Sequence, residues 1–288
     1  MRLALGTAQF GLPYGIANQA GQVTRSAAKA MLDLGAANGI DTLDTAMAYG
    51  ESEACLGEVG TRGFKLVTKL PAVPDDCDDV RGWVQAQVAA SMARLGVRVV
   101  YGLLLHRPNQ LLAGHGKALY QALQGLKEAG LVQKMGVSVY APSELAELIP
   151  RYRFDLIQAP LNLMDRRFHV TGWLQRLKDE EIEVHSRSAF LQGLLLMPQA
   201  TRPAKFASWS ELWRTWHEWL SRHNVCALQA CLAFPLSFPE IDCVVVGADS
   251  VSQLEEIISA ATSAASVDFP DLHCESENLI NPARWSHL

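Results

Sequence analysis

Four polar side chains in the first part of the chain have the types and spacing needed for acid–base chemistry on a carbonyl group. Asp44 ends one apolar run and Tyr49 follows it, while Lys69 and His106 end the next two such runs. A tyrosine hydroxyl is a poor acid near neutrality, because its ordinary pKa is about 10. A nearby ammonium favours the phenolate, and a carboxylate keeps that ammonium charged. With a histidine to hydrogen-bond the carbonyl oxygen, this set predicts protonation of an oxyanion as it forms, which carbonyl reduction by hydride requires.

The elements that must carry these side chains are short, nearly continuous apolar runs. Such runs are typical of parallel strands whose sheet is covered on both faces. Lys69 and His106, each at the end of one such run, would lie at the C-terminal edge of the sheet. We expect eight strands, at 3–6, 42–44, 65–69, 99–105, 134–139, 156–158, 183–187 and 243–247.

Amphipathic segments alternate with these runs and predict helices. Parallel strands need such crossovers, so the alternation predicts an α/β fold, a (β/α)8 TIM barrel. The four polar residues would then converge on its C-terminal face. Thr24 and Ser143 are the expected N-caps of the first and fifth helices. The helices are expected at 25–38, 53–59, 80–95, 117–129, 142–149, 172–179, 209–222 with 226–233, and 251–260.

At 288 residues the chain could form two small domains or one large domain, and the regular alternation of strands and helices favours one domain over residues 1–288. No change of composition marks a linker, and a chain that is 49% hydrophobic and 19% charged can fill a large core. An extended loop near 197–210 and a C-terminal tail from about 261 exceed the regular repeat. Extra length at this face of a barrel often builds the substrate pocket. The tryptophan-rich segment 209–220 is expected to pack as an outer helix.

Several classes of protein are disfavoured by the same sequence. The net charge of -5 argues against a nucleic-acid partner. Neither a signal peptide nor a membrane-spanning run is evident, so we expect a cytoplasmic protein with no membrane partner. The cysteines and histidines lack metal-binding spacing, and no metal site is expected. No Gly-x-Gly-x-x-Gly follows a strand, so a nicotinamide cofactor would have to bind without a Rossmann fingerprint.

The stretch from Asp44 to Gly57 reads Asp-Thr-Ala-x-x-Tyr-Gly-x-Ser-Glu-x-x-Leu-Gly. It resembles the signature of the aldo-keto reductase superfamily, and the resemblance extends from Leu5 to Ala248. It implies an NAD(P)(H)-dependent oxidoreductase that interconverts a small-molecule aldehyde or ketone and its alcohol. The implied catalytic tetrad is Asp44, Tyr49, Lys69 and His106, with direct hydride transfer and the tyrosine as proton donor. A sugar-like substrate is one possibility, with polar contacts from Gln9, Tyr14, Arg107 and Asn109.

The resemblance also implies a set of cofactor contacts. Gly6 and Thr7, with Asp44, would lie near the ribose and nicotinamide, and Ser138 and Gln158 would hold the carboxamide. The segment 186–193 resembles the family's loop along the pyrophosphate, and the segment 246–257 resembles the adenosine site. The residues implied in these two segments are Arg187, Phe190, Gln192, Gly193, Gly247, Ala248, Asp249, Gln253 and Glu256.

The chain departs from the family pattern on the cofactor side. Val139 stands where an asparagine is common, and Arg187 stands where an aromatic ring usually stacks on the nicotinamide. A guanidinium can also stack, and its charge would favour the reduced, uncharged nicotinamide. The resemblance to the family favours NADP(H). However, Asp249 and Gln253 lie in the segment where NADP-preferring members often have a lysine or arginine that binds the 2′-phosphate. The balance places NADP(H) slightly ahead of NAD(H).

Two other functions are compatible with the same barrel. Lys69 could form a Schiff base, as in an aldolase-type lyase. The superfamily also includes potassium-channel beta subunits, so the fold can serve as a non-catalytic, cofactor-binding regulatory subunit.

Overall fold

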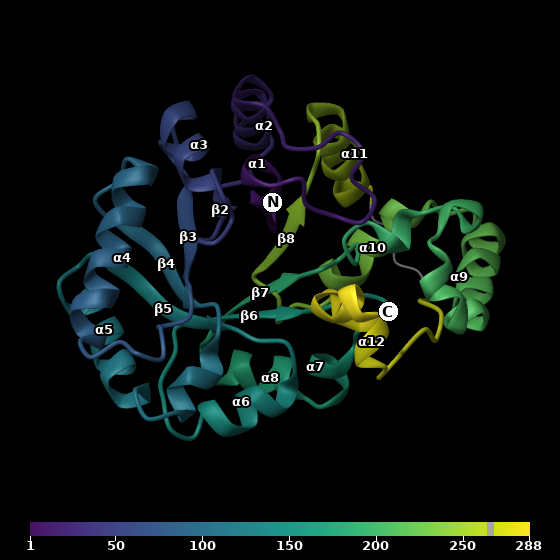
Figure 1. The fold of residues 1–288 in the computed structure, drawn as a ribbon. Coiled ribbons are helices and arrows are strands. Elements are labelled where there is room, and N and C mark those ends of the chain that lie inside the picture. The colour runs from purple at the N-terminus through teal and green to yellow at the C-terminus, as the bar shows by residue number, and fades with distance from the viewer. Residues whose placement is uncertain (264–267) are drawn as a thin grey trace.

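The computed structural model describes residues 1–263 and 268–288, and its centre is a closed barrel of eight parallel strands inside a ring of helices (Figure 1). Each strand pairs with the next along the chain, and β1 pairs with β8 to close the barrel. The (β/α)8 prediction is therefore confirmed. The strands are β1 Leu3–Gly6, β2 Thr42–Asp44, β3 Lys65–Leu70, β4 Val100–Leu105, β5 Val132–Ser138, β6 Leu156–Pro160, β7 Glu183–Arg187 and β8 Cys243–Gly247.

The strand limits agree closely with the expected ranges. β1, β2, β7 and β8 coincide with them, and β3, β4 and β6 differ only at their ends. The largest shift is in β5, which begins at Val132 and leaves Val139 outside the strand. Residues 132–133 follow a helix so closely that the sequence pattern assigned them to the connection.

Every helix expected from the sequence is present, and the structure has three short helices that were not expected. The helices α1, α7 and α12 are each too short to give a periodic apolar signal. The helices are α1 Ala8–Gly11, α2 Arg25–Ala37, α3 Ser52–Val59, α4 Val80–Leu95, α5 Gly116–Glu128, α6 Pro142–Leu148, α7 Arg167–Val170, α8 Trp173–Asp179, α9 Ser210–His223, α10 Ala227–Leu236, α11 Val251–Thr262 and α12 Glu277–Ile280.

One of the two expected helix caps is confirmed and the other is wrong. Thr24 caps α2 and accepts a hydrogen bond from the backbone N–H of Ala27 at 3.3 Å. Ser143 lies inside the first turn of α6, which begins one residue earlier at Pro142. Proline suits the first helical position because it has no N–H to satisfy there. The Glu144 side chain accepts from the preceding backbone N–H groups instead, so a serine cap is not needed.

The two segments beyond the regular repeat are compact. The loop near 197–210 forms two 3-10 turns, Gln199–Thr201 and Ala204–Trp209. The start of the expected tail belongs to α11, residues 264–267 lie outside the described part, and the chain ends in α12 and a 3-10 turn at Pro282–His287. Trp285 packs against Phe206, with ring centroids 4.9 Å apart, so the tail covers the loop.

The tryptophans of α9 have the packing role expected from their helical spacing. Trp213, Trp216 and Trp219 are buried. Trp216 also donates its indole N–H to the carbonyl of Leu195 at 3.1 Å, which ties α9 to the segment that follows β7. Within residues 1–263 and 268–288, no helix is both long and apolar enough to cross a bilayer.

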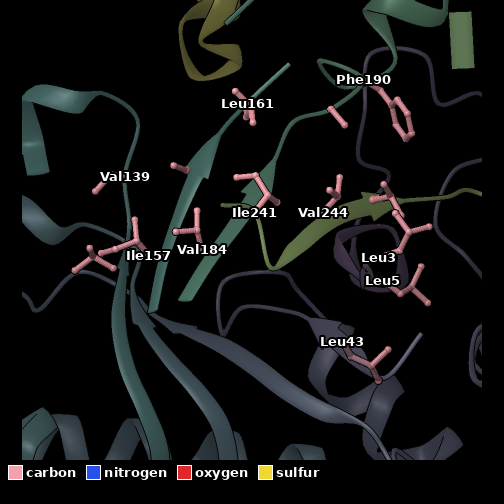
Figure 2. Packing of buried hydrophobic residues seen from close by; sticks show 14 of the residues in the cluster. Leu3, Leu5, Leu43, Val139, Ile157, Leu161, Val184, Phe190, Ile241 and Val244 are labelled. Atoms are coloured by element: carbon pink, nitrogen blue, oxygen red, sulfur yellow. The ribbon is translucent and has the colours of Figure 1, made fainter. Parts of the chain in front are cut away.

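Strand alternation separates the core from the site. Figure 2 shows Leu43, Ile157 and Val184 among the aliphatic side chains of the main core. Because successive strand residues face opposite sides, Asp44 and Gln158 point into the barrel instead. Two residues before Lys69, His106 and Gln158 lie Val67, Leu104 and Leu156, which form a separate apolar cluster. This cluster closes the barrel beneath the polar layer.

Candidate active site

The four residues predicted for catalysis line one cavity of about 650 Å³ at the C-terminal end of the barrel. Asp44 is the last residue of β2 and Tyr49 lies in the turn after it. Lys69 lies in β3, one residue before its end, and His106 directly follows β4. The barrel therefore brings together side chains from three successive strand ends, as expected.

Asp44 and Lys69 form a buried ion pair, with Lys69 Nζ 2.6 Å from Asp44 Oδ1. Lys69 is 1% exposed and Asp44 is 4% exposed. Lys69 also donates to the carbonyl of Thr45 at 2.9 Å, and Gln158 Nε2 donates to Asp44 Oδ2 at 2.7 Å. Burial lowers the pKa of Lys69, while the charge and hydrogen bond of Asp44 raise it. Asp44 thus supports the charged lysine that burial alone would disfavour.

The phenol of Tyr49 retains its proton in this environment. Burial raises the pKa of Tyr49, the charge of Asp44 raises it further, and Arg187 opposes both effects. The expected net lowering of the Tyr49 pKa is therefore wrong, because burial and the charge of Asp44 outweigh the opposing charge of Arg187. Lys69 Nζ lies 5.2 Å from the centre of the Tyr49 ring, and its recorded hydrogen bonds go to Asp44 and Thr45. The phenol is held in its acid form, which is the form that can donate a proton.

His106 faces Tyr49 across the cavity, with ring centroids 6.0 Å apart and ring planes at 80°. Burial, followed by the charges of Lys69 and Arg187, lowers the pKa of His106 to about 4. The imidazole is therefore neutral near pH 7 and can donate one N–H hydrogen bond. A carbonyl oxygen between the two rings would meet two neutral donors.

A network of hydroxyl groups supports the turn that carries Tyr49. Thr7 Oγ1 donates to the carbonyl of Asp44 at 3.0 Å, and Ser52 Oγ donates to the carbonyl of Thr7 at 2.8 Å. The hydroxyls of Thr45 and Ser52 are 3.0 Å apart. The network holds β1, β2 and the start of α3 together. Thr45 and Ser52 of the signature stretch therefore have a structural role.

Glu53 has a structural role in the same signature. It is 1% exposed and accepts from Thr68 at 2.7 Å, Ser91 at 2.6 Å and Arg94 Nη2 at 2.6 Å. A Cβ atom on Gly57 would lie 2.0 Å from the carbonyl oxygen of Arg94, so only glycine permits this approach of α3 to α4. Both residues hold the α3–α4 pair that stands behind β3.

The residues expected to hold a dinucleotide line the same cavity, with one exception. Gly6 and Gly247 are register partners at the ends of β1 and β8. A Cβ atom on Gly247 would lie 2.6 Å from Gln9 Nε2, so the glycine makes room for the side chain of Gln9 in this wall. Ser138 Oγ lies 3.4 Å from Gln158 Oε1, and this hydroxyl and amide oxygen match the donors and acceptor of a carboxamide. Ala248 is the exception, since its side chain packs in the core.

The loop after β7 forms the far wall. Ser188, Leu191, Gln192 and Gly193 all have positive φ angles, at 63°, 47°, 53° and 88°. This tight loop places Gln192 and Gly193 on the cavity, while Phe190 is also a member of the main core (Figure 2).

The segment between β1 and α2 reaches this loop, and beyond Thr7 only Gln9 and Tyr14 of this segment were expected at the site. Gln192 Nε2 donates to the hydroxyl of Tyr14 at 3.2 Å, and a Cβ on Gly193 would lie 2.5 Å from Ala17. The available signal was a long connection that contains several glycines and glutamines, and long surface loops often carry function. The missed cavity residues of this segment are Ile16, Ala17, Asn18 and Gln19.

The end of β8 gives the cavity an acidic end. Asp249, Gln253 and Glu256 line it there. The backbone N–H of Asp249 donates to Gln253 Oε1 at 2.8 Å, and Asn18 Nδ2 donates to Asp249 Oδ1 at 3.3 Å. Burial raises the pKa of Asp249, and hydrogen bonds from Gln9 and Gln253 oppose this.

Arg187 extends across the site from β7 toward β5. Arg187 Nη2 donates to the carbonyl of Val139 at 2.9 Å, and its guanidinium carbon lies 4.3 Å from the centre of the Tyr140 ring. The Val139 side chain is buried in the core (Figure 2), so its contribution to the site is this backbone carbonyl. Tyr140, which lines the cavity, was not anticipated from the sequence.

The residues suggested for substrate contacts divide into two groups. Gln9 and Tyr14 line the cavity, whereas Arg107 and Asn109 are exposed outside it. The extended loop contributes Met197, Pro198 and Thr201, as expected for extra length at this face. None of the described tail residues, 268–288, lines the cavity. Over the described ranges, no cluster of three His, Cys, Asp or Glu side chains is placed to hold a metal ion.

Comparisons with known proteins show the family to which this chain belongs. The sequence profile of the Aldo/keto reductase family matches residues 2–268. The chain is 24% identical over 261 residues to the uncharacterized oxidoreductase YqkF of Bacillus subtilis (strain 168), covering 83% of each protein. Its fold is similar to that of the aldo-keto reductase AKR11C1 from Bacillus halodurans in its holo form, with a TM-score of 0.72 and 19% sequence identity. The match covers 93% of this chain and 88% of that chain. It is also similar to PA4992 from Pseudomonas aeruginosa, with a TM-score of 0.68, 20% identity and coverage of 91% and 90%. The chain belongs to the Aldo/keto reductase family of oxidoreductases.

Proposed function

We propose that this protein reduces an aldehyde or ketone to its alcohol with NAD(P)H, or runs the reverse reaction, and that Tyr49 is the proton donor. One observation carries the proposal: the buried Asp44–Lys69 pair lies against Tyr49 at the end of a cavity that Gly6 and Gly247 also line. A proton donor, a neutral hydrogen-bond donor and a dinucleotide-sized space occur together there. The cavity volume is within the range common for cofactor and ligand pockets.

The bound nicotinamide would supply a hydride to the carbonyl carbon. His106, neutral near pH 7, would donate an N–H hydrogen bond to the carbonyl oxygen and orient it. Tyr49 would then transfer its phenolic proton to that oxygen as negative charge develops on it. The raised pKa of Tyr49 suits this order of events, because the proton is retained until a stronger base has formed.

Lys69 would stabilise the phenolate that the proton transfer leaves behind. Its ammonium lies near the Tyr49 ring and is kept charged by Asp44. The apolar cluster of Val67, Leu104 and Leu156 beneath the pair excludes water, which strengthens these charge interactions. In the direction of alcohol oxidation, the same phenolate would accept the proton.

The cofactor contacts follow the lining of the cavity. Ser138 and Gln158 would hold the carboxamide, and the loop with Gln192 and Gly193 would lie along the pyrophosphate. The sequence reading placed NADP(H) slightly ahead of NAD(H). In the described part of the chain, however, Asp249 and Glu256 line the adenosine end and no lysine or arginine does. A 2′-phosphate favours a cationic donor, so this lining supports NAD(H).

The geometry of Lys69 disfavours the Schiff-base alternative. A nucleophilic lysine must lose its proton, yet Asp44 Oδ1 lies 2.6 Å from Nζ and the carbonyl of Thr45 accepts a second hydrogen bond. Both partners stabilise the ammonium form. Borohydride reduction in the presence of a carbonyl substrate should leave Lys69 unmodified, and a stable adduct at this residue would favour the lyase.

The direct test is titration of the protein with NADH and NADPH, followed by a panel of aldehydes with loss of reduced-cofactor absorbance as readout. We expect binding of at least one cofactor and turnover of at least one aldehyde, with tighter binding of NADH. Binding of neither cofactor would contradict the proposal. Binding without turnover of any carbonyl compound would favour a non-catalytic, cofactor-binding role.

A further inference from the structure

We propose that Arg187 determines substrate specificity, by holding a carboxylate of the substrate, and that the physiological substrate is a carbonyl compound that carries this carboxylate. The inference rests on the proposed reductase activity and names the substrate class of the same site. It comes from the position and surroundings of the guanidinium.

The guanidinium of Arg187 is held in place by groups that do not neutralise it. It donates hydrogen bonds to the Val139 carbonyl at 2.9 Å and to the Ser188 hydroxyl at 3.2 Å, and its central carbon lies over the Tyr140 ring. These contacts fix the plane of the group over the cavity. Two of its five N–H donors are used, which leaves donors for a ligand.

Arg187 also lacks a counter-ion. In the part of the chain that the structure describes, no carboxylate forms an ion pair with Arg187. The half-buried Arg94 and the largely buried Arg167, by contrast, are paired with Glu53 and Asp165. An unpaired charge in a partly dry site is unfavourable, and a planar guanidinium matches the two oxygens of a carboxylate. The site is therefore prepared for an anionic group on its ligand.

The charge of Arg187 acts at the tetrad end of the cavity. Arg187 is among the causes that lower the pKa of Tyr49, Lys69 and His106, so its guanidinium lies within electrostatic reach of all three. The carboxylate there, Asp44, is already paired with Lys69. The other acidic lining residues belong to the β8–α11 end. A substrate whose carbonyl oxygen lies between Tyr49 and His106 would direct a carboxyl substituent toward Arg187.

The resemblance to the family implies that the residue at this position stacks on the nicotinamide. The contacts of the Arg187 guanidinium favour a different role, which is to bind the substrate. Here the guanidinium carbon lies over the Tyr140 ring, and the group donates to the Val139 carbonyl just beyond the end of β5. β5 adjoins β4, which His106 directly follows, whereas the adenosine end adjoins β8.

The test compares charged and neutral aldehydes of matched shape. We would measure kcat/KM for 2-, 3- and 4-carboxybenzaldehyde and for the corresponding carbamoylbenzaldehydes, with the preferred reduced cofactor. We expect the wild-type protein to favour at least one carboxylate over its amide by about 10- to 100-fold, the range typical of charge-assisted hydrogen bonds. Arg187→Gln should bring this ratio close to one. Arg187→Met, which fills similar space without charge, is the second variant if the first does not fold.

Arg107→Gln is the matched control, because Arg107 is near His106 but exposed outside the cavity. It should preserve the carboxylate-to-amide ratio to within about two-fold, as expected for a screened surface charge. The ratio is the readout because it is unaffected by a uniform change in cofactor binding. An unchanged ratio in both Arg187 variants, or equal turnover of every carboxylate and its amide by the wild type, would overturn the inference and leave the reductase function intact.

A different result would count against the reductase function alone. If no aldehyde is turned over, calorimetric titration with benzoate and with benzamide decides whether the anion site exists. Tighter binding of benzoate by the wild type, lost in Arg187→Gln, would support it. Equal binding of the two compounds would overturn it.

Discussion

Gln158 donates its side-chain amide to Asp44 Oδ2 at 2.7 Å, on the oxygen opposite the one that Lys69 occupies. Both oxygens of the buried carboxylate are therefore satisfied by neighbours on β6 and β3. Gln158 is left with its amide oxygen directed to Ser138. The residue expected to hold the cofactor's carboxamide thus also orients the ion pair of the tetrad, so cofactor binding and proton-donor geometry are connected through one side chain.

The Asp44–Lys69 pair should contribute to stability as a unit. Asp44→Asn leaves the buried ammonium without a counter-ion and should reduce the free energy of unfolding by about 3–5 kcal/mol. Lys69→Met should have a comparable effect, because it leaves the carboxylate unpaired. The double variant should lose less than the sum of the two. Urea denaturation in a double-mutant cycle measures the coupling, and additive losses would show that the pair is not coupled.

His106 should remain neutral throughout the ordinary working range. Its folded pKa of about 4 lies below the unfolded value of 6.5. Between these values the unfolded chain binds a proton that the folded chain does not, so this group's contribution to stability falls as pH decreases from 6.5 toward 4. Titration of the imidazole by NMR should show no midpoint near 6.5. A midpoint there would contradict the burial and charge effects assigned to the site.

Glu53 should matter for stability more than for chemistry. Glu53→Gln weakens the bonds to Arg94, Thr68 and Ser91 and should reduce the free energy of unfolding by about 2–3 kcal/mol, the range for buried hydrogen bonds to a charged group. Cofactor affinity should be retained. Glu58→Gln is the matched control on the same helix, since Glu58 pairs with Arg25 at the surface. Equal loss in the two variants would remove the structural role assigned to Glu53.

Arg187 should influence the balance between the two forms of the cofactor. Its positive charge disfavours the oxidised nicotinamide cation, so Arg187→Tyr should improve binding of the oxidised form relative to the reduced form. Fluorescence titration with both forms measures the ratio of dissociation constants. The same ratio in wild type and variant would show that the guanidinium does not act on the nicotinamide.

The barrel and the convergence of the tetrad could be predicted from the sequence because both follow from local pattern. Apolar runs that end in Asp44, Lys69 and the stretch before His106 are strands of a parallel sheet, and such strands end on one face. The resemblance to the family also implied individual residues around the cavity. Gln158 and Arg187 are examples.

The features that the sequence could not supply depend on long-range contacts. The raised pKa of Tyr49 reflects burial and the charge of Asp44, whose combined effect the spacing of the residues does not reveal. The approach of Ala17 to Gly193 joins two loops with no pairing pattern. The contact of Arg187 with the Tyr140 ring depends on the backbone direction after Ser138, where β5 ends.

The most direct measurement of the central claim is the effect of Tyr49→Phe on turnover. Removal of the phenolic proton should lower kcat by about 10²- to 10⁴-fold, the usual contribution of a general acid. Affinity for the reduced cofactor should be unchanged, because the variant keeps the ring and loses only the hydroxyl. A kcat close to that of the wild type would remove Tyr49 from the acid role and contradict the proposed mechanism.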